Sequence, residues 1–136
     1  MRRVNLQFNL DSQLPAIYGV ADQLTQVIMN LLINAADALE STEGREQSIT
    51  LHTEVFGGNV RLTVADNGCG MDQDTLNRVF EAFFTTKRKG NGLGLSLCYS
   101  IITGHGGTIE IDSTPGEGTR VQVILPIPAE EEGDTL

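Results

Sequence analysis

The sequence has no tryptophan, few aromatic residues, only two cysteines and no long hydrophobic run. No apolar stretch approaches the roughly 20 residues that a transmembrane helix needs, so we expect no membrane span in this chain. Met1-Arg2-Arg3 is not followed by an apolar block, and no secretory signal is visible. Cys69 and Cys98 lack the spacing of a CxxC pair or a metal site. We therefore interpret them as free thiols of a cytosolic protein rather than as a disulfide.

Basic residues are also scarce, since 9 Lys and Arg stand against 18 Asp and Glu and the formal net charge is −9. This balance argues against non-specific binding to DNA or RNA. An acidic protein that binds a polyphosphate must neutralise it locally, with backbone amides, a metal ion and a few cations. The one basic cluster is Lys87-Arg88-Lys89, directly before a glycine-rich loop. The alternative is that these three cations are simply solvent-exposed, which is common for a loop.

The length of 136 residues and the hydrophobic content of 40% fit one globular domain with a single core. We expect this domain over residues 1–128 and a disordered acidic tail over residues 129–136. A polar loop is expected over residues 41–47. Alternating apolar residues predict strands at 4–10, 48–56, 60–66, 108–113 and 119–125. Helical spacing predicts helices at 22–39 and 93–104, and a short one from Asp72 or Gln73 to Arg78.

Gly90, Gly92 and Gly94 stand at every second position ahead of the last predicted helix. Glycine lets a backbone approach a ligand closely, and a helix N-terminus attracts anions. The pattern predicts a phosphate-binding loop, although glycine clusters also make ordinary turns. It is neither a dinucleotide fingerprint, since no strand precedes it, nor a P-loop, since no lysine follows its last glycine.

A polar stripe runs along the first long helix, because Gln26, Asn30, Asn34 and Asp37 recur at steps of four, four and three. The stripe is closely flanked by apolar residues. It is therefore interpreted as the floor of a site, and the alternative is that the amides face water. An amide oxygen is a hard ligand that suits Mg²⁺.

Asp66 ends a predicted strand, on the same face as Val60, Leu62 and Val64. An ionised carboxylate at the end of an apolar face needs a donor, such as the exocyclic amine of a base. The common alternative is a turn aspartate that caps its own backbone. The inward position argues against that alternative.

Three of the five phenylalanines, Phe80, Phe83 and Phe84, lie shortly before the glycine loop. Aromatic residues beside glycines suggest a mobile lid with apolar anchors. The alternative is that all three belong to the core, and we expect some of the three to anchor the lid and some to lie in the core.

Four sequence boxes, in order, resemble those of two-component sensor histidine kinases, and the Phe-Phe-Thr-Thr-Lys form is similar to the nitrogen-regulation type. The boxes span most of the chain, from Gln26 to Pro126, and an ordered set of this kind is highly specific. They are the N box at 30–38, the G1 box at 66–71, the F box at 80–87 and the G2 box at 92–96, followed by a GxGT element at 116–119.

The resemblance implies the ATP-binding catalytic domain of the GHKL superfamily. Its fold would be an α+β two-layer sandwich, a mixed sheet of about five strands covered on one face by about three helices, with a flexible ATP lid. It implies ATP and Mg²⁺ as cofactors. In this family the residue matching Asp66 accepts from the adenine amine, Asn34 holds the metal with Asn30 beside it, and Lys87 meets the polyphosphate.

The resemblance also implies which residues make up the site. The catalytic residues would be Asn30, Asn34 and Lys87. The residues around the nucleotide would be Asn30, Asn34, Asp37, Asp66, Gly68, Gly70, Met71, Phe80, Thr86, Lys87, Gly90, Gly92, Leu93, Gly94, Leu95 and Thr119.

Related ATPases resemble one another in having a glutamate where this chain has Asn30, which cannot accept a proton at neutral pH. Transfer to an external nucleophile is therefore favoured over hydrolysis. His52 and His105 lie outside the family's phosphoacceptor setting and are interpreted as structural. The expected partners are a histidine-bearing dimerisation domain of a longer cytoplasmic or membrane-anchored kinase and, downstream, a response regulator, with neither nucleic acid nor membrane contact. The alternatives are a hydrolytic ATPase, a serine-directed anti-sigma-factor kinase and a non-catalytic nucleotide-binding module.

Overall fold

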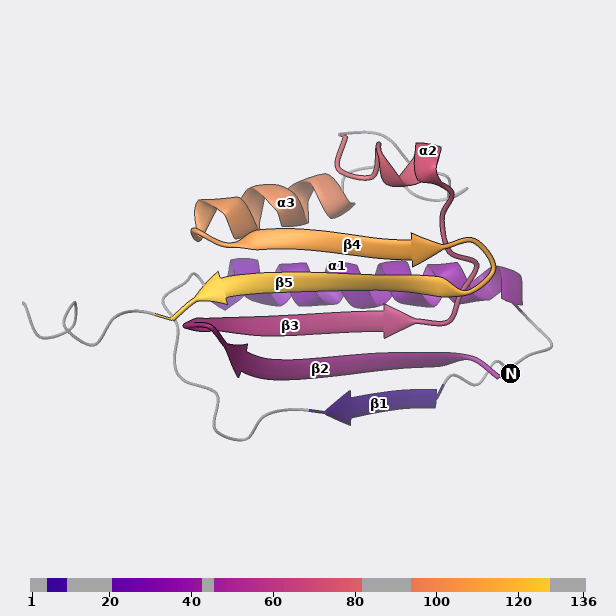
Figure 1. The fold of residues 1–136 in the computed structure, drawn as a ribbon, viewed down its shortest axis with the longest axis horizontal. Coiled ribbons are helices and arrows are strands. Elements are labelled where there is room, and N and C mark those ends of the chain that lie inside the picture. Colours follow the sequence, from indigo (N-terminus) through magenta and orange to yellow (C-terminus); the bar gives the residue numbers. More distant parts are fainter. Residues whose placement is uncertain (1–4, 10–20, 43–45, 82–93, 128–136) are drawn as a thin grey trace, which may run out of the picture.

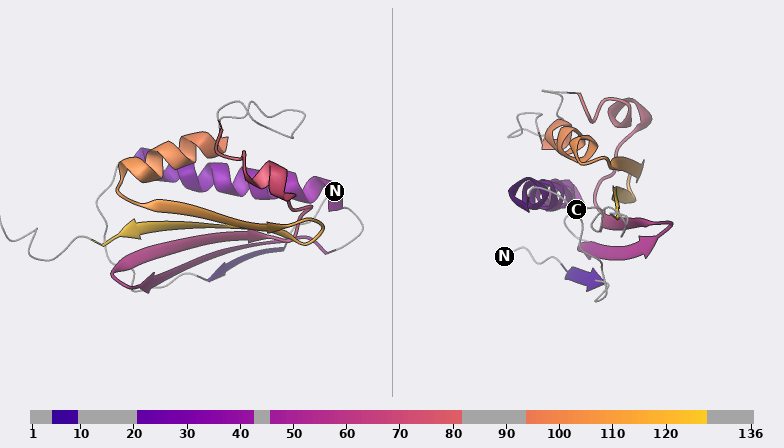
Figure 2. Two further views of the ribbon diagram at one scale, coloured as in Figure 1. Left: turned by 45° about the horizontal axis from the view of Figure 1, so that its top comes forward. Right: turned by 90° about the vertical axis from the view of Figure 1, so that its left-hand side faces the viewer.

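The structure is a computed structural model, which describes residues 5–9, 21–42, 46–81 and 94–127. Within them, one five-stranded sheet in the order β1-β2-β3-β5-β4 is covered on one face by helices (Figures 1 and 2). The strands are β1 (Asn5–Asn9), β2 (Ser48–Phe56), β3 (Asn59–Asp66), β4 (Thr108–Thr114) and β5 (Gly118–Pro126). The helices are α1 (Ala21–Leu39), the 3-10 helix η1 (Glu40–Thr42), α2 (Gln73–Leu76) and α3 (Gly94–Gly104).

The sheet is mixed, because β1 runs parallel to β2 while the other neighbours are antiparallel. Gly57 and Gly58 join β2 to β3 with φ angles of 53° and 78°. Two consecutive positive φ angles are what a tight hairpin turn requires. None of the helices in the described part of the chain is both long and apolar enough to cross a membrane.

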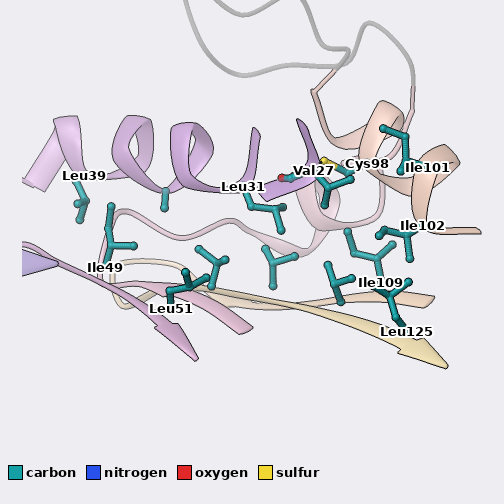
Figure 3. Packing of buried hydrophobic residues seen from close by; sticks show 14 residues of the cluster. Val27, Leu31, Leu39, Ile49, Leu51, Cys98, Ile101, Ile102, Ile109 and Leu125 are labelled. Carbon is teal, nitrogen blue, oxygen red and sulfur yellow. Dashed lines mark hydrogen bonds between the residues drawn. The ribbon is translucent and has the colours of Figure 1, made fainter. Parts of the chain in front are cut away.

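The apolar stripe of α1 lies against the sheet (Figure 3). Val27, Leu31, Ala35 and Leu39 follow one another at steps of four and are at most 3% exposed. Full burial of one such aliphatic side chain contributes about 1.5–3 kcal/mol. This stripe therefore fixes which side of α1 remains available for polar residues.

Helix α3 covers the other part of the same sheet face and also contacts α1. Cys98 and Ile102 are fully buried, and Ile101 is nearly so. Because α1 and α3 share one core with the sheet, the polar face of α1 is held beside α3. Both cysteines are free, as the sequence predicts, and the structure adds that Cys69 is exposed and Cys98 is buried.

The mixed five-stranded sheet with helices on one face confirms the predicted fold, and β2 has the predicted bounds. The expected polar loop over residues 41–47 is partly wrong. Its first residues belong to η1, and Gln47 is buried, with its amide Nε2 donating to the Leu39 carbonyl at the end of α1. Helix α2 is shorter than predicted and ends at Leu76, after an N-cap by Asp72. The predicted lid over 82–93 and the acidic tail lie outside the described residues.

Both histidines have contacts that fit structural roles. His52 lies on the open face of the sheet, and its Nε2 is 2.9 Å from the Glu54 carboxylate. His105 follows α3, where its backbone N–H and its Nδ1 both contact the Ile101 carbonyl, at 3.1 and 2.8 Å. It thereby caps carbonyl groups that the helix end would leave without a partner.

Candidate functional site

Several motif-bearing segments meet at one end of the sheet, where β3 and β4 end and β5 begins (right in Figure 1). The turn after β3 contacts the end of α1, because the Cys69 N–H donates to the Ala38 carbonyl at 3.0 Å. The same turn contacts the β4–β5 connection, because the Gly116 N–H donates to the Cys69 carbonyl at 2.7 Å. The fold thus joins the predicted N box, G1 box and GxGT element.

A polar row crosses three strands at this end of the covered sheet face. The register pairs Asp66 of β3 with Thr119 of β5, and Thr119 with Ser113 of β4. The preceding row on the same face is apolar and pairs Val64 with Val121. Polar side chains at the edge of an apolar face are costly unless they have partners, so this row is a candidate ligand site.

The half-buried Asp66 carboxylate lies at the β3 end of the row. Burial raises the pKa of this carboxyl above its usual value, while the backbone N–H groups of Gly68 and Thr119 act in the opposite direction. Gly68 N donates to Oδ1 at 2.8 Å. The turn-capping alternative is therefore correct as well, since Asp66 both caps its own turn and belongs to the inward face.

Asn67 anchors this turn to the start of β2. Its Oδ1 accepts from Ser48 N at 2.8 Å, and its Nδ2 donates to the Glu46 carbonyl at 2.8 Å. Both bonds link segments about twenty residues apart, which is why local sequence patterns did not single this residue out.

Glycine is required at two positions of the turn. A Cβ on Gly68 would lie 2.5 Å from the Ala38 carbonyl oxygen. Gly70 has a φ of 70°, and a Cβ there would overlap the Thr114 carbonyl. Close backbone packing against α1 and β4 therefore explains why both positions carry no side chain.

The other end of the row contains a hydroxyl cluster. Ser113 Oγ accepts from Met71 N at 2.8 Å and lies 2.8 Å from Thr119 Oγ1 and 3.1 Å from the Gly118 carbonyl. Gly118 has a φ of 134°, and a Cβ on it would overlap the Asp66 carbonyl. Of these residues, Met71 and Thr119 are predicted site residues, whereas Ser113 is not.

The polar stripe of α1 lies beside the N-terminus of α3. Asn30, Asn34 and Asp37 are half-buried, whereas Gln26 is exposed. The position of a Cβ on Gly94 would be 3.9 Å from Asn34 Nδ2, so the first turn of α3 is close to this amide. The half-buried residues of the stripe are consistent with the floor interpretation, whereas Gln26 is exposed, as the water-facing alternative expects.

Asn30 is tied to α3 through a buried thiol. Its side chain hydrogen-bonds Cys98, and burial raises the pKa of that thiol to about 11. The Cys98 sulfur also lies 3.9 Å from the Val27 carbonyl. A carboxamide takes up no proton at neutral pH whatever its partners, so the Asn30 side chain offers no general base at this position.

The donors at the site fit Mg²⁺ held jointly with a polyphosphate. The described residues contain no cluster of three His, Cys, Asp or Glu side chains that could form a metal cage. Mg²⁺ needs no such cage, because it keeps several waters and binds one or two protein oxygens together with substrate phosphates. The Asn34 side chain carries an amide oxygen, a donor of the type that such a site uses.

Phe80 and Leu95 face the protein rather than open solvent. Both are partly buried and pack against the core cluster, and the Phe80 ring lies 5.1 Å from the Tyr99 ring of α3. The core alternative is therefore correct for Phe80. Phe83, Phe84, Thr86, Lys87, Gly90, Gly92 and Leu93 lie outside the described residues, so their roles stay predictions.

Comparison with known proteins identifies similar sequences and folds. Residues 19–129 match the family described as "Histidine kinase-, DNA gyrase B-, and HSP90-like ATPase". The chain is 38% identical over 126 residues to the sensor histidine kinase ZraS of Escherichia coli O157:H7, covering 93% of this chain and 27% of ZraS. It thus spans about a quarter of the length of that relative.

Two solved structures are similar in fold. The catalytic domain of histidine kinase ThkA aligns with a TM-score of 0.77 and 30% identity, over 90% of this chain and 78% of that domain. Full-length ShkA in complex with AMPPNP aligns with a TM-score of 0.78 and 30% identity, over 90% of this chain and 25% of ShkA.

Proposed function

This chain belongs to the family of histidine kinase-, DNA gyrase B- and HSP90-like ATPases, and from that premise we propose that it is the ATP-binding catalytic domain of a sensor histidine kinase. It binds Mg-ATP and transfers the γ-phosphoryl group to a histidine on a separate dimerisation domain. A response regulator receives the phosphoryl group afterwards, and the domain works in the cytoplasm. The similarity to ZraS and to the ThkA catalytic domain supports the kinase branch of the family.

The observation that carries the nucleotide proposal is the half-buried Asp66 carboxylate in the row that crosses β3, β5 and β4. A carboxylate at this place offers acceptors only, and an adenine amine supplies the matching donor. The complex of the related ShkA with AMPPNP agrees with a nucleotide in this fold.

The phosphate end of the nucleotide is assigned to the stripe of α1 and the start of α3. Asn34 would hold Mg²⁺, which when bound neutralises phosphate charge, and the N-terminus of α3 favours anions. Lys87, Thr86 and the amides of Gly92 and Leu93 are proposed to contact the phosphates as well. In phosphoryl transfer, such positioning and charge stabilisation do most of the catalysis.

Transfer is preferred to hydrolysis because of Asn30. Its amide is bonded to the buried Cys98 thiol and has no proton-accepting capacity at neutral pH. A water placed there would lack a general base, which is commonly worth about 10²–10⁴ in rate. The hydrolytic ATPase therefore stays the second candidate.

The proposal is tested by mixing this chain with the purified dimerisation segment of its full-length kinase and γ-labelled Mg-ATP. We expect labelled phosphate on a histidine of that segment, stable to base and labile to acid. A parallel titration measures ATP affinity with and without Mg²⁺. Rapid phosphate release without labelled protein would favour the ATPase, and absence of any nucleotide binding would refute both readings.

A further inference from the structure

Ser113 of β4 lies outside all the sequence boxes, yet its hydroxyl contacts three residues from two other segments of the site. It accepts from Met71 N at 2.8 Å, lies 3.1 Å from the Gly118 carbonyl and lies 2.8 Å from Thr119 Oγ1. These contacts bridge 42 residues of sequence on one side and the β4–β5 turn on the other. A serine hydroxyl at a strand end can be satisfied by water alone, so three protein contacts indicate a positioning role.

The three contacts can be satisfied together in only one way. A serine hydroxyl has one proton and two acceptor lone pairs. Met71 N is a fixed donor and the Gly118 carbonyl is a fixed acceptor, so Ser113 donates its proton to Gly118. The Thr119 hydroxyl must then donate to Ser113 Oγ. In the opposite arrangement, the Gly118 contact would have no proton.

This arrangement determines what Thr119 offers a ligand. Its only hydroxyl proton is used on Ser113, so Thr119 Oγ1 can only accept a further hydrogen bond. Thr119 also pairs in register with Asp66, and its backbone N–H bonds the Asp66 carboxylate. The two neighbouring side chains therefore present acceptors alone.

We propose that Ser113 is a specificity-determining, positioning residue, which holds the Thr119 hydroxyl as an acceptor beside Asp66 and so selects a base with an exocyclic amine over one with an oxo group. The inference rests on the proposed nucleotide-binding function. A freely rotating Thr119 hydroxyl could donate to a 6-oxo group, and Ser113 prevents this. Hypoxanthine, which differs from adenine at this group, is the natural probe.

The experiment compares the affinities of the Mg²⁺ complexes of ATP and ITP for the chain and its variants. We expect Ser113→Ala to lower the ratio of the ITP Kd to the ATP Kd by roughly three- to tenfold, the worth of one hydrogen bond. Ser113→Thr, which keeps the hydroxyl, should restore the ratio. Thr108→Ala removes an exposed hydroxyl from the same strand and should leave the ratio unchanged.

Hydrogen exchange in the nucleotide-free protein adds a direct readout of the contact. The Met71 amide should exchange slowly in the parent chain and faster in Ser113→Ala. If Ser113→Ala does not fold, Thr119→Val is used instead. It removes the hydroxyl acceptor, so it should weaken the binding of ATP and leave the binding of ITP unchanged.

The failures can be told apart. If Ser113→Ala leaves the ratio of the ITP Kd to the ATP Kd unchanged, even where both nucleotides bind more weakly, the role of Ser113 is overturned while nucleotide binding itself stands. If the parent chain binds neither nucleotide, the proposed function itself falls, and the specificity role falls with it.

Discussion

Replacing Asp66 by asparagine should separate base recognition from the rest of nucleotide binding. The substitution removes the half-buried charge and turns one carboxylate oxygen into an amide donor. A hydrogen bond to a charged group contributes about 1.5–3 kcal/mol, so the Kd for ATP should rise by roughly 10- to 150-fold. The phosphate contacts that we propose for α1 and α3 should be unaffected.

Removing the Asp66 charge should not lower the stability of the nucleotide-free protein at neutral pH. Burial raises the pKa of Asp66, so the ionised form is disfavoured in the folded chain. The native state therefore binds more protons than the unfolded chain between pH 3.8, the ordinary pKa, and the raised value. Across that window the unfolding free energy contributed by Asp66 falls as the pH rises, and Asp66→Asn should lose this dependence.

Calorimetric titration with ATP and with purine riboside triphosphate, which lacks the amine, provides the assay. Asp66→Asn should weaken ATP and leave the amine-free nucleotide nearly unchanged. Asp112→Asn is the matched control, because that carboxylate is exposed on the edge strand and pairs with Arg120. Unchanged ATP affinity in Asp66→Asn, or equal loss of both nucleotides, would refute the reasoning.

Three further substitutions or treatments test the packing around the site. Gly68→Ala places a Cβ 2.5 Å from the Ala38 carbonyl oxygen, so it should lower the free energy of unfolding in urea by about 1–3 kcal/mol and also lower the affinity for ATP. The control Gly104→Ala, at a helical position with open space around it, should raise the free energy of unfolding by up to about 1 kcal/mol. Equal effects of the two substitutions would contradict the contact between Gly68 and Ala38. Leu31→Ala should lower the free energy of unfolding by about 3–4 kcal/mol, and a loss below about 1 kcal/mol would contradict its burial. A thiol reagent at pH 8 should modify the exposed Cys69 quickly and Cys98 only after denaturation, because burial raises the pKa of Cys98 to about 11; rapid reaction of both would contradict its placement.

Much of the fold is predictable because its elements are locally consistent. In β2 and β3 the apolar residues alternate, and in α1 they recur at steps of three and four, so periodicity alone identifies the buried face. The bounds of β2 agree with the prediction to the residue. The short α2 was less predictable, because it has only four residues and none of them is buried, so no periodic pattern marks its end.

The site was predictable where a motif is contiguous and missed where contacts are distant. Asn67 stands in the predicted G1 box, yet its bonds reach Glu46 and Ser48, which no local pattern connects to it. One sequence feature points to Ser113: the alternation of a strand places it after Ile109 and Ile111 on the inward face of β4. A polar residue at the third inward position marks the level at which the apolar core ends.

Asp66 shows why the structural and functional interpretations of a polar residue need not compete. A carboxylate has two oxygens with about four lone-pair sites. Two backbone N–H groups, of Gly68 and Thr119, occupy part of this capacity and fix the orientation of the group. The remaining lone pairs stay available to a ligand. Capping the turn is therefore what orients Asp66 for the base recognition that we propose, and a residue that satisfied only its own backbone would leave no acceptor for the base.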